Sequence, residues 1–179
     1  MSAASGMLRG MTMFERVDPP QVADERAMLP AYLDYHRATL EMKCSGLTDD
    51  QLRERSVAAS SLSLLGLVRH LTEVERSWFQ ARFARTDAPP IYFSDDNLDG
   101  DFDDLDSPDV AQVFATYREA CEESRRIVAR AGSLDDVGVR GDGSEVTLRW
   151  ILLHMLEEYA RHNGHADLLR QSIDGATGE

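Results

Sequence analysis

The sequence predicts an all-α protein built as a bundle of four long helices. Four segments carry apolar residues at intervals of three and four, and none shows the sustained alternation of a β-strand. At least one connection between them is long and rich in proline, glycine and aspartate, which is typical of a bundle with a crossover loop. The 179 residues amount to one domain. We expect a flexible tail over residues 1–19 and a single domain over residues 20–175.

The first predicted helix covers residues 22–44. Helical spacing places one set of residues on the same side of it: Leu29, Leu33, His36, Leu40 and Lys43. Gly46 is expected to end this helix, and residues 47–50 have the pattern of a turn that begins a further short helical piece.

The second predicted helix covers residues 61–84. Ser60 and Ser61 offer hydroxyl groups that can cap its first turn. Its apolar stripe consists of Leu64, Leu67, Val68, Leu71, Val74, Trp78 and Phe79.

Residues 87–106 form the least helical part of the interior. They contain Pro89, Pro90, Gly100 and a run of aspartates at Asp87, Asp95, Asp96, Asp99, Asp101, Asp103 and Asp104. Runs of carboxylates are usually solvated, so a solvent-exposed crossover loop is expected. A calcium loop is the alternative, but residues 95–100 lack its register of alternating aspartates closed by a glutamate.

The third predicted helix begins near Ser107, because a capping serine followed by Pro108 is typical of a first helical turn. It ends at Gly132. Residues 133–146 contain several glycines and are expected to form another loop.

The fourth predicted helix begins after Thr147, which is placed to cap it, reaches about Ile173 and stops before Gly175. Between His154 and Arg170 it reads HMLEEYARHNGHADLLR. Helices in a bundle bury their inward faces, so polar residues on those faces need partners or a bound ion.

The chain carries a formal net charge of −13. An acidic surface of this size repels nucleic-acid backbones and anionic membrane faces, so neither is an expected partner. No segment approaches the roughly 20 apolar residues of a membrane span, and residues 1–14 lack the apolar core of a signal peptide. We therefore expect a cytoplasmic protein. Lys43 is the only lysine, a bias that we interpret as the composition of a GC-rich genome.

The two cysteines, Cys44 and Cys121, are far apart in the sequence and belong to no CxxC pair. Isolated cysteines in a domain of this size indicate a reducing cytoplasm, in which they usually serve as small buried apolar residues. A catalytic cysteine is the alternative, but neither residue lies in a nucleophile signature.

Potential metal ligands lie on one face of the fourth predicted helix, at His154, Glu158, His162 and His165. At 100° per residue they fall within an arc of about 80°. Ligands of one ion must converge to about 2.0–2.2 Å from it. His154 and His162 are separated by about 12 Å along the axis, and Glu158 and His165 by about 10.5 Å, so neither pair shares an ion easily. The remaining pairs are His154/Glu158, Glu158/His162 and His162/His165.

A third ligand must come from another helix. His70 is the best candidate, because it lies within the apolar stripe of the second predicted helix, close to Leu67 and Leu71. A core histidine hydrogen-bonded to a carboxylate is the alternative for a single residue. Several inward histidines with a glutamate favour a divalent cation, which satisfies all of them together. His36 is a weaker candidate that can instead pack beside Tyr35.

Two histidines and one carboxylate suit zinc best, with nickel, iron or manganese as alternatives. Three protein ligands leave coordination positions open. An open position is the property that separates a catalytic metal site from a closed structural one.

The segments LVRHLTEVERSW and WILLHMLEEYARHNGHADLLR together resemble the DinB-like superfamily. Within the superfamily the chain resembles a branch common in actinobacteria, close to the mycothiol-dependent maleylpyruvate isomerases and to mycothiol S-transferase-like proteins. The resemblance extends from about Phe14 to Gly175. It implies an up-down-down-up four-helix bundle with a metal ion held by one histidine on the second helix and two residues on the fourth. These positions are His70, Glu158 and His162 here; many members have histidine where Glu158 stands, whereas the maleylpyruvate isomerases use a His/Glu/His zinc set.

The resemblance also implies a function, that of a metal-dependent thiol S-transferase or isomerase. The metal ion would activate a low-molecular-weight thiol, here mycothiol, for attack on a small electrophile, because a cation favours thiolate over thiol. Exposed helix faces are compatible with a homodimer. One alternative is a non-enzymatic stress-response or binding protein with a structural metal site. Another is a metal-dependent hydrolase with Glu73 or His165 as base.

His165 lies one turn beyond His162 and is the candidate catalytic residue, as a proton shuttle or as a hydrogen-bond donor to a ligand. His154 is expected to orient Glu158 or to fill the core. Packing roles are expected for Trp78, Trp150 and Tyr159. Ion pairs, rather than substrate contacts, are expected for Arg161, Asp167 and Arg170.

Overall fold

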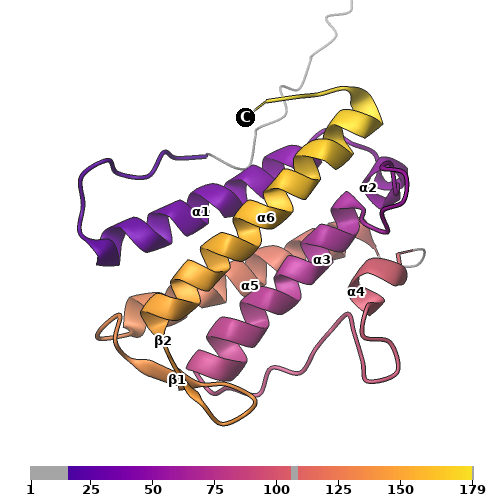
Figure 1. Ribbon diagram of the computed structural model, residues 1–179. Helices are drawn as coiled ribbons and strands as arrows, with labels where there is room; N and C mark the ends of the chain where they lie inside the picture. The colour runs from indigo at the N-terminus through magenta and orange to yellow at the C-terminus, as the bar shows by residue number, and fades with distance from the viewer. Residues whose placement is uncertain (1–15, 106–108, 179) are drawn as a thin grey trace, which may run out of the picture.

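The computed structural model describes residues 16–105 and 109–178. Its long helices are α1 (Glu25–Cys44), α3 (Leu64–Glu75) with its π-helical continuation η1 (Arg76–Phe83), α5 (Val110–Arg130) and α6 (Leu148–Asp174). In Figure 1, α1 and α6 run toward the end of the molecule at which the chain finishes, whereas α3 and α5 run the opposite way. The protein is therefore the all-α, up-down-down-up bundle that the sequence predicts.

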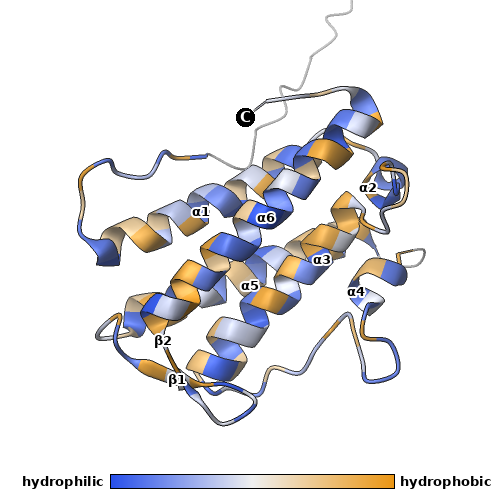
Figure 2. Ribbon diagram, in the orientation of Figure 1, coloured by the Kyte–Doolittle hydropathy of each residue, from blue (hydrophilic) through white to orange (hydrophobic). Residues whose placement is uncertain are grey.

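α6 lies between α1 and α3, and α5 packs against α3 behind it (Figure 1). Each long helix carries both hydrophobic and hydrophilic residues along its length (Figure 2). The inward residues form one continuous core, whose completely buried members include Leu40, Leu64, Leu71, Leu152 and Tyr159. Burial of each such leucine stabilises the fold by roughly 1.5–3 kcal/mol.

The first two helices are bounded by local capping. Asp24 accepts a hydrogen bond from the backbone N–H of Ala27 at 2.9 Å, so α1 begins three residues later than predicted. Gly46 follows the end of α1 with a φ of +77°, a conformation that favours glycine. The predicted short helical piece is α2 (Asp49–Arg53), with Thr48 in a capping box.

Ser63, rather than Ser60 or Ser61 as predicted, caps α3. Its hydroxyl accepts the N–H of Gly66 at 3.1 Å, whereas the Ser60 hydroxyl accepts the N–H of Leu62 in the preceding turn. All three serines have the chemistry of a cap. Which serine caps the helix depends on where the chain enters the core, and Ser63, directly before α3, is the completely buried one.

α3 continues without a break into the π-helix η1, and the two together occupy most of the second predicted helix. At the end of η1 the N–H of Ala84 donates to the carbonyl oxygen of Phe79 at 2.9 Å. π-helical segments are rare and are frequent at functional sites. Apolar periodicity does not distinguish an α-helix from a π-helix over these residues, so this change in helix type is not predicted.

The crossover between η1 and α5 contains a short helix, α4 (Gly100–Asp103). The predicted cap at Ser107 and Pro108 lies outside the described residues. Asp109 caps α5, accepting the N–H of Ala111 at 2.9 Å.

The loop predicted over residues 133–146 contains an antiparallel hairpin of β1 (Val137–Val139) and β2 (Glu145–Thr147). The prediction of an irregular loop is wrong here, because strands of three residues are too short to show alternation. Gly138 lies against η1. A Cβ atom at this position would be 2.6 Å from the carbonyl oxygen of Arg82, so only glycine fits.

α6 begins and ends as predicted. Thr147 accepts the N–H of Trp150 at 3.2 Å, and Gly175, with a φ of +78°, donates its N–H to the carbonyl oxygen of Gln171 at 2.9 Å. Neither α6 nor any other helix of the described residues is long and apolar enough to cross a membrane.

A buried polar network joins the four long helices. Arg37 on α1 donates two hydrogen bonds of 2.7 Å to Glu75 on α3. Tyr159 on α6 donates to Oε1 of Glu75 at 2.8 Å, and its hydroxyl lies 3.0 Å from that of Tyr117 on α5. Arg37 is 4% exposed and Glu75 is 0% exposed. A charge pair so deeply buried is tolerated because its hydrogen bonds are made.

Candidate metal centre

Two histidines and one glutamate come together between α3 and α6. His70, Glu158 and His162 each present one potential ligand atom, and these atoms lie within 4.8 Å of one another. Nε2 of His162 is 3.5 Å from Oε2 of Glu158, and the ring centroids of His70 and His162 are 4.8 Å apart. These are the three residues that the sequence and the resemblance single out as metal ligands.

The donor atoms fit a divalent cation. Ligands at about 2.0–2.2 Å from one ion lie roughly 3–4 Å apart, so small side-chain adjustments suffice. Burial, together with the neighbouring His70 and His165, lowers the pKa of His162 to about 4. At neutral pH this ring is therefore uncharged, which is the form that coordinates a metal.

Asp101 positions the His70 ring. Its Oδ2 lies 2.8 Å from Nδ1 of His70, and the residue is only 5% exposed. The prediction of a solvated crossover is wrong at this residue, because α4 packs against α3 and carries Asp101 with it. A proton held on Nδ1 by the carboxylate leaves Nε2 as a lone-pair donor, the usual support for a metal-binding histidine.

Sequence reasoning missed Asp101, since a run of aspartates does not show which of them is buried. The one available signal is Phe102, an aromatic residue inside the acidic run. Its ring stacks on that of His70, with centroids 5.0 Å apart. An apolar residue in such a run marks a turn that packs inward.

His165 lies beside His162, as its position one turn further along α6 suggests. Their Nδ1 atoms are 3.4 Å apart and their ring centroids 5.3 Å apart. The His165 side chain is half-buried. It can therefore reach both the centre and solvent.

His154 contacts the other side of Glu158, with 3.5 Å between Nε2 and Oε1. Burial lowers the pKa of His154, although Glu158 opposes this effect. His154, Glu157 and Glu158 form a second group of potential ligand atoms. Glu157 is exposed and paired with Arg161, so this group is the weaker candidate.

His36 lies apart from the centre, between α1 and α6. Asn163 donates to its carbonyl oxygen at 3.0 Å. Its ring meets the ring of Tyr35 edge-on at 6.0 Å. His36 is thus the packing residue that the sequence offered as the alternative to a ligand.

Glu73 is unsuited to the role of a hydrolytic base. It is buried and accepts the backbone N–H groups of Ile91 and Tyr92 at 2.6 and 2.5 Å. Its carboxylate anchors the crossover to α3.

The polar residues of α6 that were assigned to ion pairs do form them. Arg161, Asp167 and Arg170 pair with Glu157, Lys43 and Asp174 respectively. The packing role of Tyr159 is confirmed by its complete burial.

Both cysteines are buried free thiols, as predicted. Burial raises the pKa of Cys44 to about 12, with a further contribution from Glu41, and it raises that of Cys121 to about 12 beside Glu75. Each thiol therefore stays protonated at neutral pH. A thiol in that state is a poor nucleophile.

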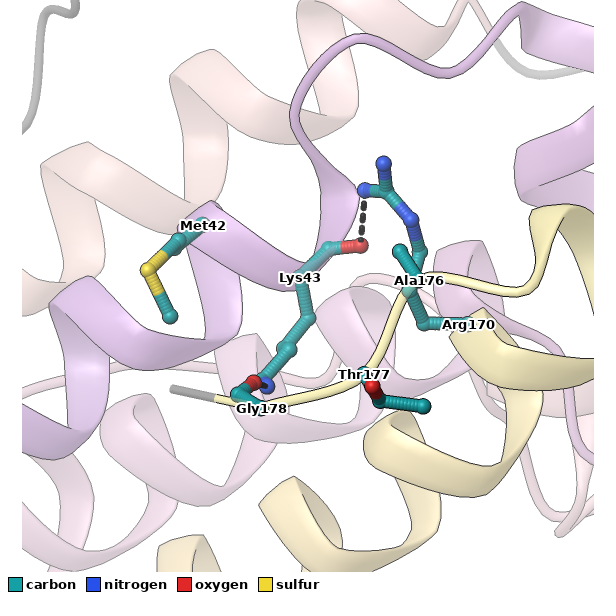
Figure 3. Close-up of a pocket in the computed structure, with 6 residues that line it drawn as sticks. All are labelled: Met42, Lys43, Arg170, Ala176, Thr177 and Gly178. Atoms are coloured by element: carbon teal, nitrogen blue, oxygen red, sulfur yellow. Dashed lines mark hydrogen bonds between the residues drawn. The ribbon is translucent and has the colours of Figure 1, made fainter.

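A hollow of about 140 Å³ lies where α1 ends, beneath the chain that follows α6. Figure 3 shows its lining: Met42, Lys43, Arg170, Ala176, Thr177 and Gly178. Arg170 donates to the carbonyl oxygen of Lys43 at 2.9 Å across it. The lining includes no histidine, cysteine or carboxylate, so we attribute it to docking of the C-terminal segment.

A four-helix bundle whose second and last long helices bring two histidines and a glutamate together defines a DinB-like protein. A family model described as Mycothiol-S-transferase matches residues 28–175. The chain belongs to the mycothiol S-transferase family. None of the curated proteins compared with the chain matches it.

Proposed function

We propose that this protein is a metal-dependent S-transferase that joins mycothiol to a small electrophile. The convergence of His70, Glu158 and His162, in a chain of the mycothiol S-transferase family, carries the proposal. Zinc is the favoured metal for two imidazoles and a carboxylate, with nickel, iron or manganese as alternatives. Cys44 and Cys121 of the protein are buried and protonated, so mycothiol, rather than a cysteine of the chain, is the proposed nucleophile.

A divalent cation held by these three residues would favour the thiolate form of a bound thiol near neutral pH. Asp101 keeps the His70 ring in place, and Glu158 supplies negative charge between His154 and His162. His165 is the proposed catalytic residue, which takes the thiol proton and releases it to solvent. The thiolate sulfur forms a bond to the electrophilic carbon. The bond from that carbon to its leaving group breaks, and the leaving group departs with the electron pair.

The proposal extends to the cellular compartment. Two free, buried cysteines fit a reducing environment, and low-molecular-weight thiols act where they are kept reduced. We therefore place the protein in the cytoplasm.

Elemental analysis of chelator-free protein, paired with a thiol-dependence assay, tests the proposal. We expect about one divalent ion per chain and turnover of model electrophiles only when mycothiol is present. His162→Ala should lose both properties. The control is His36→Ala, which removes a histidine of α1 that lies apart from the candidate metal centre. This variant should retain both the metal ion and the thiol-dependent turnover.

Three outcomes would overturn the proposal. A wild-type protein without metal contradicts the ligand assignment, and equal turnover without thiol favours hydrolysis. If metal loss only lowers the melting temperature and no thiol-dependent turnover exists, the metal site is structural.

A further inference from the structure

Beside the candidate metal centre lies an aromatic cluster of three rings, built from two elements distant in the sequence, η1 and α6. Trp78 on η1 and Trp150 on α6 have ring centroids 5.2 Å apart. The ring of His154 lies 4.7 Å from Trp78 and stacks on Trp150 at 5.0 Å with an interplanar angle of 17°. Because His154 also contacts Glu158, the cluster borders the centre directly.

Two arginines lie over this cluster. The guanidinium carbon of Arg82, on η1, is 4.6 Å from the ring centroid of Trp78, and that of Arg140, next to β1, is 5.7 Å from the centroid of Trp150. Gly138 brings the hairpin into contact with the backbone of η1 at Arg82. The fold thus holds both guanidinium groups against the cluster.

Neither arginine forms an ion pair with a carboxylate of the described residues, although the chain carries a net charge of −13. Other arginines follow the opposite pattern, and Arg149, for example, contacts both Glu25 and Asp135. Burial and the neighbouring Arg140 both lower the pKa of Arg82, so its charge lacks compensation. Arg140 also acts on Asp142 through space, without pairing with it.

The two arginines and the aromatic rings define the charge and the shape of a ligand that would bind to the cluster. Two unpaired guanidinium groups attract a carboxylate or a similar oxyanion, to which arginine donates paired hydrogen bonds. Indole and imidazole faces stack on flat, conjugated groups. Trp150 is 42% exposed, so a small molecule has access to the cluster. Trp78 packs against the hydrophobic core, as expected, whereas the exposed part of Trp150 leaves room for a ligand.

We propose that Trp78, Trp150 and His154, together with Arg82 and Arg140, bind the electrophilic substrate as a flat, conjugated or aromatic anion. The assignment to the electrophile rests on the proposed S-transferase function. The binding itself requires neither metal nor thiol. The cluster would hold the substrate beside Glu158, one of the three residues that would hold the metal ion.

Intrinsic fluorescence reports on this site alone, because Trp78 and Trp150 are the two tryptophans of the chain. We would titrate full-length protein with benzoate, with its neutral analogue benzamide, and with cyclohexanecarboxylate, which is anionic but not flat. Benzoate should bind about tenfold more tightly than benzamide, because only the carboxylate accepts charge-assisted hydrogen bonds from the arginines. It should also bind severalfold more tightly than cyclohexanecarboxylate, because only a flat ring stacks on the indole and imidazole faces. Equal affinities for benzoate and benzamide would overturn the proposal.

Variants separate this site from other anion sites. Arg82→Gln and Arg140→Gln should each reduce benzoate binding about tenfold, whereas Arg126→Gln, on exposed α5 surface, should not change it. Should Arg82→Gln fail to fold, Arg140→Gln in the exposed turn decides the question. An Arg140→Gln protein that binds benzoate like the Arg126→Gln control contradicts the proposal.

The metal centre is the competing anion site. His162→Ala should keep the preference for benzoate, and loss of the preference in that variant would place the anion on the metal and overturn the proposal. Failure of the S-transferase proposal is distinguishable, because it would remove thiol-dependent turnover and leave the fluorescence titration unchanged.

Discussion

Asp101 lies 2.8 Å from Nδ1 of His70 and connects the crossover after η1 to the candidate metal centre. The contact ties a segment of high negative charge to a ring on the most apolar helix of the bundle. The contact fixes the tautomer of His70, because the carboxylate selects which ring nitrogen carries the proton. The second nitrogen is then available to a metal ion.

Replacement of Asp101 by asparagine should weaken metal binding by about 10- to 100-fold, the usual effect of removing a carboxylate that supports a metal-binding histidine. Competition with a chromophoric chelator measures the dissociation constant. Asp103→Asn is the matched control, because Asp103 is exposed and pairs with Arg55. Equal affinities for the two variants would show that Asp101 is only structural.

His165→Gln should retain the metal and lose turnover. The half-buried ring lies 5.3 Å from that of His162, and a positioned proton acceptor contributes about 10²- to 10⁴-fold to rate. The expected result is an unchanged metal content with kcat lowered at least 100-fold. Loss of metal in this variant would instead make His165 a ligand or a support for one.

Much of the fold could be predicted because apolar spacing is a local property. The stripe from Leu64 to Phe79 is read directly from the sequence, and its spacing predicts a helix. Capping was less predictable, since Ser60, Ser61 and Ser63 offer the same hydroxyl group. The π-helix and the short hairpin were missed because both depend on contacts such as that of Gly138 with η1.

The residues of the candidate site likewise fall into those that the sequence predicts and those that it does not. Spacing along one helix leaves three possible pairs, and the family resemblance selects Glu158 and His162 among them. His70 follows from its place in an apolar stripe. Asp101 does not, because its contact with His70 spans 31 residues. The Arg37–Glu75 pair spans 38 residues and leaves no local pattern. Such contacts depend on how separate elements meet.

Glu75→Gln should destabilise the fold by roughly 3–5 kcal/mol, because it leaves the buried guanidinium of Arg37 without its counter-charge. Urea unfolding followed by circular dichroism measures the free energy of unfolding. Glu119→Gln, on the exposed surface of α5, should be nearly neutral. A small effect at Glu75 would mean that Asp34, which also contacts Arg37, compensates alone.

Gly138→Ala should destabilise the fold by about 1–3 kcal/mol. An added Cβ would lie 2.6 Å from the carbonyl oxygen of Arg82, and backbone atoms cannot move aside as a flexible side chain can. Gly141→Ala, in the same hairpin, adds a Cβ with no atom within 4 Å and serves as the control. Gly138→Ala should also shift the tryptophan emission, since the hairpin packs on η1, the helix that carries Trp78. Similar stabilities for the two variants would contradict the close approach.

The buried thiols predict both low reactivity and a loss of stability at alkaline pH. The pKa of Cys44 is raised from its ordinary value of 9.0 to about 12. A raised pKa means that the native state favours the protonated thiol. This contribution to stability is complete below pH 9 and is lost as pH rises from about 9 toward about 12. The melting temperature of the wild-type protein should therefore fall more steeply between pH 9 and 11 than that of Cys44→Ala.

At pH 8 a disulfide reagent should modify Cys44 and Cys121 only at the rate of protein opening, so addition of denaturant should release both thiols at once. Rapid modification of native protein would show that a thiolate is accessible and would return cysteine to the list of candidate nucleophiles.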